Sequence, residues 1–367
     1  MLAADPGRTI PPPGPASSGD RGPHGASAGP DGATSGRADP GRTRGWASPT
    51  RRGLLLPAAA AVLPRGASAQ GWPGRPIRLV VPYAPGGTTD VMARLVAERL
   101  GARLGQPVVV ENRPGAGATI GADLVARAPA DGYTLLMSNS GSHGVSPTLY
   151  PNLPYDPLRD FTHVALVVVS PSTLVVNAAN PARDLGAFIA RARERGELEF
   201  AVSGLGSSSH LTGLRLGLAL GVAVNAIPYR GAGPAMTDTI AGVVPAMFDS
   251  LPSAAPHILA GSVRGLAVSS AERSRRFPDL PTLREGGVDL VSNAWFGLSA
   301  PAGLPDPILR RYAAEIRAVL RDPGVVERFE DLSGAPPPES TPEAYAAFVA
   351  REIAEWAPII RAAGLRP

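Results

Sequence analysis

From Trp72 onward, short apolar runs of strand length alternate with segments whose apolar residues have helical spacing. The strands predicted in the first part of this region are Ile77–Pro82, Pro107–Glu111 and Thr134–Met137, and the helices between them are Asp90–Arg103 and Ile120–Arg127. Alternation of this kind is typical of parallel βαβ units whose strands are buried on both faces of the sheet.

Two long apolar runs, Phe161–Val169 and Thr173–Val176, interrupt the alternation around Ser170-Pro171. It then resumes, with strands predicted at 199–202, 224–228, 243–248, 263–268 and 296–300, and helices at 211–220, 234–240, 254–259, 307–320, 323–332 and 341–363. Roughly 300 residues is near the size at which one core divides into two. We therefore expect two α/β lobes, with the chain crossing between them near 170–173 and returning near 295–300.

The N-terminal segment has a different character. Residues 1–49 are rich in Pro, Gly and Ser without apolar periodicity, which predicts a disordered leader or a start codon assigned too far upstream. Residues 50–69 then combine Arg51-Arg52, an apolar run at Gly53–Leu63 and Ala67-Ser68-Ala69. These are the three parts of a secretory signal, so we predict cleavage after Ala69 and a periplasmic protein; the alternative is an alanine-rich linker. The arginine pair leaves the general and twin-arginine export routes both open.

Composition excludes several classes of protein. The chain has no cysteine, and arginine supplies all 35 of its basic side chains, which excludes a Walker A lysine, a Schiff-base lysine and a lipid-anchored cysteine. The formal charge of +4 comes from residues 1–69, because the remaining residues carry 27 basic and 27 acidic groups. We therefore expect no nucleic-acid partner. The five histidines lack metal-ligand spacing, so we expect neither a metal nor a cofactor.

The loop Pro85-Gly86-Gly87-Thr88-Thr89 stands where a predicted strand passes into a helix. Glycines there allow backbone N–H groups to converge on a ligand, and the helix start adds partial positive charge. The loop therefore predicts a site for a negatively charged group, although a capped turn without a ligand would have the same sequence. Asp90, which follows directly, is interpreted as ordering the loop.

Similar polar loops follow other predicted strands, at 138–142, 203–210, 229–234 and 249–252. In open α/β sheets, ligands bind beyond the carboxyl ends of the strands. The five loops together therefore predict a cleft that is lined with hydrogen-bond donors and shared by both lobes.

The motifs in these loops resemble a known family. "VPYAPGGTTDVMARLVAERL", "LYPNLPYDPLRDFTHVALV", "SHLTG", "IPYRGAGPAMTD", "MFDSLPSAAPHILAGSVRGLAVSS" and "WFGLSAPAGLP" are similar to the Bug proteins, the extracytoplasmic solute receptors of the tripartite tricarboxylate transporter system. The resemblance covers essentially all of 72–367. It implies a type II periplasmic-binding fold, with one lobe formed by 70–171 and 298–367 and the other by 172–297. The hinged lobes would close on a small carboxylate, and a monomer would deliver it to a membrane permease.

The resemblance also implies which residues bind the ligand. All of them lie in the loops that follow predicted strands. The residues are Pro85, Gly86, Gly87, Thr88, Thr89, Ser138, Ser140, Gly206, Ser207, Ser208, Ser209, Gly231 and Asp249. The ligand would be a di- or tricarboxylate, an amino acid or an aromatic acid. Asp249 would pair with an ammonium group or cap a helix. Leu205, Leu214 and Pro245 depart from the family pattern, which usually has Asn, Glu and Asp there, and Leu205 removes an amide side chain from the cleft.

Two alternatives to a transport receptor are a ligand sensor for a signalling system and a hydrolase. The hydrolase would use Ser208 or Ser209 with His210, but adjacent Ser and His form a catalytic unit only when an orienting acid and an oxyanion hole converge on them. We therefore predict that the protein is not an enzyme.

Overall fold

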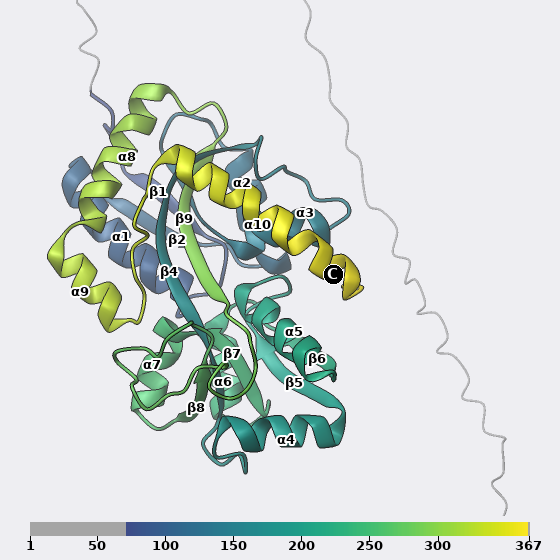
Figure 1. Cartoon of the computed structure of the whole chain (residues 1–367). Coiled ribbons are helices and arrows are strands. Elements are labelled where there is room, and N and C mark those ends of the chain that lie inside the picture. The colour runs from purple at the N-terminus through teal and green to yellow at the C-terminus, as the bar shows by residue number, and fades with distance from the viewer. Residues whose placement is uncertain (1–70, 366–367) are drawn as a thin grey trace, which may run out of the picture. The chain divides into compact units, whose positions relative to one another are not determined.

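The computed structural model describes residues 71–365, and the arrangement of their helices and strands is drawn in Figure 1. The predicted leader, signal sequence and cleavage site lie outside the described residues. Within residues 71–365, no helix is both long enough and apolar enough to cross a membrane.

The strands form one nine-stranded sheet in the order β2-β1-β3-β9-β4-β7-β5-β6, with β8 paired to β4. The strands are β1 (Ile77–Val81), β2 (Val108–Asn112), β3 (Thr134–Asn139), β4 (Phe161–Asn177), β5 (Glu197–Val202), β6 (Ala223–Pro228), β7 (Ala246–Ser250), β8 (Val263–Val268) and β9 (Asn293–Pro301). The α-helices are α1 (Thr88–Leu104), α2 (Thr119–Ala126), α3 (Ser146–Leu149), α4 (Leu185–Arg195), α5 (Ser208–Leu220), α6 (Ala232–Ile240), α7 (Leu251–Leu259), α8 (Asp306–Leu320), α9 (Pro323–Asp331) and α10 (Pro342–Ala362). A 3-10 turn, η1 (Ala116–Ala118), and a π-helix, η2 (Ser140–Val145), complete the order.

Figure 1 shows two groups of elements, one around β1, β2 and β3 and the other around β5, β6, β7 and β8. The long strands β4 and β9 run through both groups. From Phe161 to Pro171, β4 pairs with β9, and from Ser172 to Asn177 it pairs with β7 and β8. The two groups thus share a continuous sheet that changes partners within one strand. The lobe limits 70–171 with 298–367, and 172–297, stay a prediction.

The predicted βαβ units are parallel, and the strands that connect them pair antiparallel with their neighbours. The pairs β1–β2, β1–β3, β5–β6 and β5–β7 are parallel, whereas β4 pairs antiparallel with β7, β8 and β9, and β3 pairs antiparallel with β9. The parallel units predicted from the alternation of strands and helices are therefore confirmed, and the sequence analysis assigned no direction to the two connecting strands. Burial on both faces gives a crossing strand the same continuous apolar pattern as a parallel strand, so the pattern does not encode direction.

Two local predictions need correction. The apolar runs on either side of Ser170-Pro171 belong to the single strand β4, because the fixed φ of proline is compatible with extended backbone where the strand changes partners. Helix α4 was not predicted, although Leu185, Phe188 and Ile189 have helical spacing and the Asp184 side chain accepts from the Ala187 N–H at its start.

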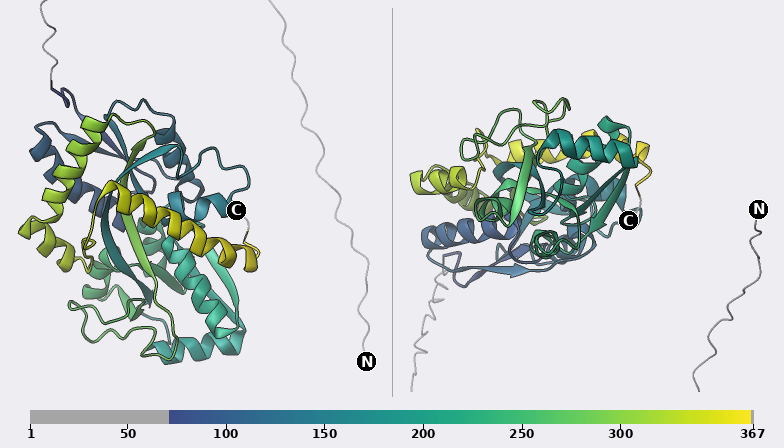
Figure 2. Two further views of the ribbon diagram at one scale, coloured as in Figure 1. Left: turned by 45° about the horizontal axis from the view of Figure 1, so that its top comes forward. Right: turned by 90° about the horizontal axis from the view of Figure 1, so that it is seen from below.

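Helices cover both faces of the sheet, which buries alternate residues on opposite sides. Leu79 of β1 packs in a cluster with residues of α1 and α8, and its neighbour Val80 packs in a second cluster with residues of α2. Figure 2 shows α1 and α10 on opposite sides of the sheet. The strand ends are thereby held at fixed positions, and the loops that follow them form the candidate site.

Candidate functional site

A small cavity lies at the carboxyl ends of β1, β3, β5 and β7. Its volume is about 30 Å³. Its lining combines small hydroxyl-bearing residues, two aromatic rings and one carboxylate: Tyr83, Gly87, Thr88, Thr89, Asn139, Ser140, Ser203, Ser207, Ser208, Ala232, Asp249, Ser250 and Phe296. These residues come from both groups of elements, so the cavity is shared between them, as the loop pattern predicts.

Four α-helices begin at this cavity. The first residues or N-caps of α1, α5, α6 and α7 line it. The N-cap residues of α1, α6 and α7 make no side-chain hydrogen bond to their helices, although Thr88 Oγ1 accepts from the Ser253 N–H in the first turn of α7. The first N–H groups of a helix have no acceptor inside the helix and carry partial positive charge. None of the described residues that line the cavity is basic. The site therefore favours an anion through main-chain N–H groups and hydroxyls.

Seven of the predicted ligand residues line the cavity and six do not. Those in the lining are Gly87, Thr88, Thr89, Ser140, Ser207, Ser208 and Asp249. Those outside it are Pro85, Gly86, Ser138, Gly206, Ser209 and Gly231. All of the second set except Gly231 lie one or two residues from the first in sequence, and Gly231 precedes the lining residue Ala232.

Ser138 is the predicted residue whose surroundings differ most from a ligand site. Its buried hydroxyl donates to the Gly297 carbonyl oxygen at 3.0 Å and lies 2.7 Å from the Tyr345 hydroxyl and 2.9 Å from that of Ser299. It fastens β3 to β9 and α10. Because side chains alternate along a strand, Ser138 points away from the face toward which Asn139 points.

Sequence reasoning missed six lining residues: Tyr83, Asn139, Ser203, Ala232, Ser250 and Phe296. Four of them, Asn139, Ser203, Ala232 and Ser250, lie within the polar loops predicted at 138–142, 203–210, 229–234 and 249–252. Tyr83 and Phe296 lie outside these loops, and an aromatic residue near the end of a strand is usually interpreted as part of the hydrophobic core.

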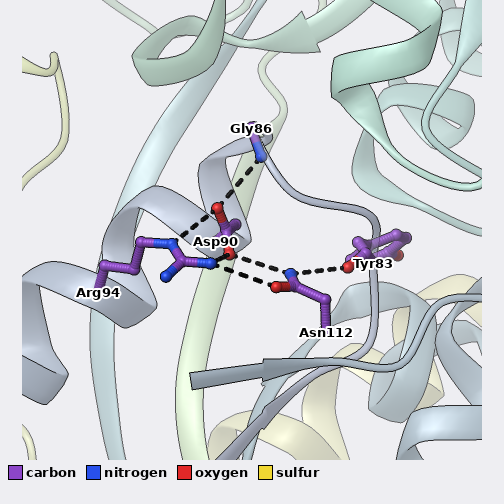
Figure 3. Close-up of polar contacts among 5 residues, drawn as sticks. All are labelled: Tyr83, Gly86, Asp90, Arg94 and Asn112. Carbon is purple, nitrogen blue, oxygen red and sulfur yellow. Dashed lines mark hydrogen bonds and ion pairs between the residues drawn. The ribbon is translucent and has the colours of Figure 1, made fainter. Parts of the chain in front are cut away.

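The first-lobe loop is braced by Asp90, which lies beneath it in Figure 3. The Gly86 N–H donates to Asp90 Oδ2 at 3.1 Å, and Arg94 Nη2 and Asn112 Nδ2 donate to Asp90 Oδ1 at 2.9 and 3.0 Å. Asn112 Nδ2 also donates to the Tyr83 carbonyl oxygen at 3.0 Å. Burial alone would raise the pKa of Asp90, but these donors hold its pKa below the ordinary value. The interpretation that Asp90 orders the loop is confirmed by these contacts.

Replacing Asp90 with alanine is expected to weaken ligand binding about tenfold, because removing the charged acceptor releases the Gly86 N–H and loosens the loop. Titration calorimetry with a dicarboxylate measures the change. Asp123→Ala is the matched control, since Asp123 also accepts from an arginine four residues later but lies away from the cavity. Equal affinities for the two variants would contradict a positioning role for Asp90.

The two groups of elements touch directly at the mouth of the cavity. The Ala84 N–H donates to the Arg230 carbonyl oxygen at 2.9 Å, and the Thr88 hydroxyl donates to Ser253 Oγ at 2.9 Å. A Cβ atom on Gly233 would lie 2.6 Å from the Pro85 carbonyl oxygen. The loops meet through small residues and backbone, and larger side chains would separate them.

Asp249 is the one carboxylate among the described residues that line the cavity. Its Oδ1 accepts from the Ser250 N–H at 2.7 Å and its Oδ2 accepts from the Ser253 hydroxyl at 2.5 Å. Burial raises the pKa of Asp249 to about 7, against the opposite effect of these two donors. Among the described residues, no arginine forms an ion pair with it.

Residues 92–365 match the family described as the tripartite tricarboxylate transporter family receptor. The chain belongs to this family. Among its relatives is protein BugT of Bordetella pertussis, which is 42% identical over 317 residues that span 86% of this chain and 96% of BugT.

Solved structures of similar receptors have the same fold. The periplasmic binding protein BugD has a TM-score of 0.77 and 37% identity, over 80% of this chain and 99% of BugD. A Rhodopseudomonas palustris protein with adipate has a TM-score of 0.78 and 36% identity, over 81% of this chain and 99% of that protein. MatC from the same organism, with bound malate, has a TM-score of 0.75 and 36% identity, over 78% of this chain and 99% of MatC. The resemblance to the Bug family and the expected type II periplasmic-binding fold are confirmed.

In this receptor the residues of the hydrolase alternative serve to shape a loop. The Gly206 N–H donates to Nδ1 of His210 at 3.0 Å, and burial lowers the pKa of His210 to about 4. Ser209 Oγ accepts from the Ser203 N–H at 3.1 Å and lies 2.8 Å from Ser207 Oγ. The imidazole nitrogen that faces the loop is thus occupied by a main-chain donor. The family and its solved structures are solute-binding proteins. Within the described region, no group of three His, Asp or Glu residues is placed to hold a metal ion.

Proposed function

We propose that this protein is a periplasmic receptor that captures a small carboxylate between its two lobes and delivers it to a permease of the tripartite tricarboxylate type. The observation that carries the proposal is the convergence of four helix starts on a cavity whose lining, as far as residues 71–365 form it, holds no basic side chain. Main-chain donors in a site away from water bind a carboxylate strongly, because each hydrogen bond strengthens as the local dielectric falls.

The neighbours with known ligands support a dicarboxylate. One was solved with adipate and another with malate, and each shares about a third of its residues with this chain. The hydroxyls of Thr89, Ser140 and Ser208 give the cavity donors on several sides, which suits a ligand with a carboxylate at each end.

Ligand entry requires the lobes to move apart. A volume of about 30 Å³ accommodates about two water molecules, less than a four-carbon dicarboxylate needs. Loop contacts such as that between Ala84 and Arg230 close the mouth. We infer that β4 and β9, which cross between the lobes, bend as a hinge during opening.

A thermal-shift assay of residues 70–367 tests the proposal. Malate or adipate should raise the melting temperature, because a ligand that binds only the native state stabilises it. Amino acids and aromatic acids in the same screen define the class of ligand. A screen with no stabilising carboxylate, together with turnover of an ester panel that Ser209→Ala abolishes, would favour the hydrolase instead.

Gly87→Val is expected to remove the thermal shift while the ligand-free protein remains folded. A Cβ atom on Gly87 would lie 3.1 Å from the Ala232 Cβ of the other lobe, so valine would both fill the cavity and hold the loops apart. Circular dichroism checks folding, and calorimetry with malate checks binding. Wild-type affinity in this variant would remove the first-lobe loop from the site.

A further inference from the structure

Asp249 is the acid that any bound carboxylate would have to approach, because it lines the same small cavity. We propose that a dicarboxylate binds to this receptor together with one proton, which Asp249 holds against the ligand. The proposal rests on the proposed function and identifies the residue that sets the charge of the accepted ligand.

The geometry gives Asp249 hydrogen-bond donors but no positive charge. Both of its oxygens accept from uncharged groups, the Ser250 N–H and the Ser253 hydroxyl. The side chain is 3% exposed, so water does not screen it. Bringing a ligand carboxylate beside an ionised Asp249 would place two like charges in a water-poor site, and such pairs retain a proton.

Closure of the lobes completes the surroundings of Asp249. Ser253 donates to Asp249 through its hydroxyl and accepts from the Thr88 hydroxyl of the first lobe at 2.9 Å. The Ser253 N–H donates in turn to Thr88 Oγ1 at 3.2 Å. The acid is therefore enclosed by the contact that joins the lobes, and its charge state is linked to the closed form that holds the ligand.

Among the described residues, no basic side chain lines the cavity. The titratable and charged side chains on the helices that begin at the cavity are Asp90, Arg94, Glu98, Arg99 and Arg103 on α1, His210 and Arg215 on α5, Asp238 on α6 and His257 on α7. Tyr83 lies in the lining, and the exposed Arg230 precedes α6. Asp90 and Arg94 neutralise each other, and Asp238 accepts from the Tyr229 hydroxyl. The β4 residue opposite Asp249 is the uncharged Thr173.

Burial already moves the pKa of Asp249 to about 7 without a ligand. A ligand carboxylate raises this pKa further, so above neutrality binding takes one proton from the buffer acid and forms the O–H bond on Asp249. Below about pH 6 the proton is present before binding. The uptake of a proton on ligand binding can therefore be measured only at alkaline pH.

Titration calorimetry of the mature chain with malate, in phosphate and in Tris at pH 8.5, measures the coupling. The dependence of the observed enthalpy on buffer ionisation enthalpy should correspond to uptake of about one proton, and Kd should rise about tenfold per pH unit above pH 8. Asp249→Asn mimics the protonated acid. It should bind malate with no proton uptake and a nearly flat pH profile.

Asp156→Asn is the matched control, because it removes a surface acid paired with Arg159 and should keep the wild-type proton uptake. Tight malate binding by the wild type without proton uptake would overturn the proposal and leave the carboxylate receptor intact. Binding of aspartate alone, lost in Asp249→Asn, would also overturn it, since Asp249 would then pair with an ammonium group. Failure of malate, adipate and aspartate to bind at any pH would overturn both proposals.

Discussion

Gly233→Ala is expected to weaken carboxylate binding about ten- to a hundredfold while the free energy of unfolding stays equal or increases. Gly233 is the second residue of α6, and the nearest atom to an added Cβ is the Pro85 carbonyl oxygen of the other lobe at 2.6 Å. Overpacking of this size costs about 1–3 kcal/mol, and the cost falls only on the closed form. Alanine is the better helix former, by about 1 kcal/mol, so the ligand-free protein does not lose stability.

Calorimetry with malate and urea unfolding measure the two quantities separately. Gly186→Ala is the matched control, because Gly186 lies in the first turn of α4 and its added Cβ would meet only Asp184 Oδ1, at 3.4 Å. Gly117→Ala should weaken binding further, since its Cβ would collide with the Leu205 carbonyl oxygen across the cleft and its φ is +59°. Unchanged affinity in Gly233→Ala would mean that the ligand-bound form does not close through these loops.

The fold was largely predictable because strand and helix periodicity survive in a two-lobed α/β protein. The strands at 134–137 and 263–268 and the helix at 307–320 were placed within two residues of their observed bounds. The strands that cross between the lobes were harder. Burial on both faces gives β4 and β9 the same apolar pattern as parallel strands, and nothing in that pattern gives their direction or partners.

The sequence predicts the loops whose main-chain N–H groups face the cavity better than it predicts the individual side chains of the lining. Loops such as 85–89 and 206–209 are recognisable from the glycine and hydroxyl residues that follow a strand, and both contribute residues to the cavity lining. Within a loop, the residue that faces the cavity depends on alternation and on the closure of the lobes. That is why Ser138 points into the core, and why Tyr83 and Phe296 form part of the wall.

Three buried histidines in the described region are His143, His163 and His210. Their titration is expected to lower the free energy of unfolding in acid, whereas the titration of Asp249 has the opposite effect. Burial lowers the pKa of all three, and that of His163 falls to about 4. A base whose folded-state pKa is depressed adds stability at neutral pH, which is lost as pH falls from the unfolded value toward the folded one. Asp249 acts in the opposite sense, because its raised pKa lets the folded state take up a proton as pH falls.

His163→Gln is therefore expected to reduce the loss of stability between pH 6.5 and 4 by roughly 3 kcal/mol relative to the wild type. His163 packs edge-on against the rings of Tyr345 and His143, with Nδ1 3.4 Å from Ser299 Oγ. Within residues 71–365, no acid forms an ion pair with His163. Urea unfolding across this pH range gives the difference in slope, which is insensitive to any constant destabilisation by the substitution. His257→Gln, on the half-exposed side of α7, serves as the control. Parallel stability profiles for His163→Gln and the wild type would show that the buried imidazole takes up its proton without cost, contrary to its dry surroundings.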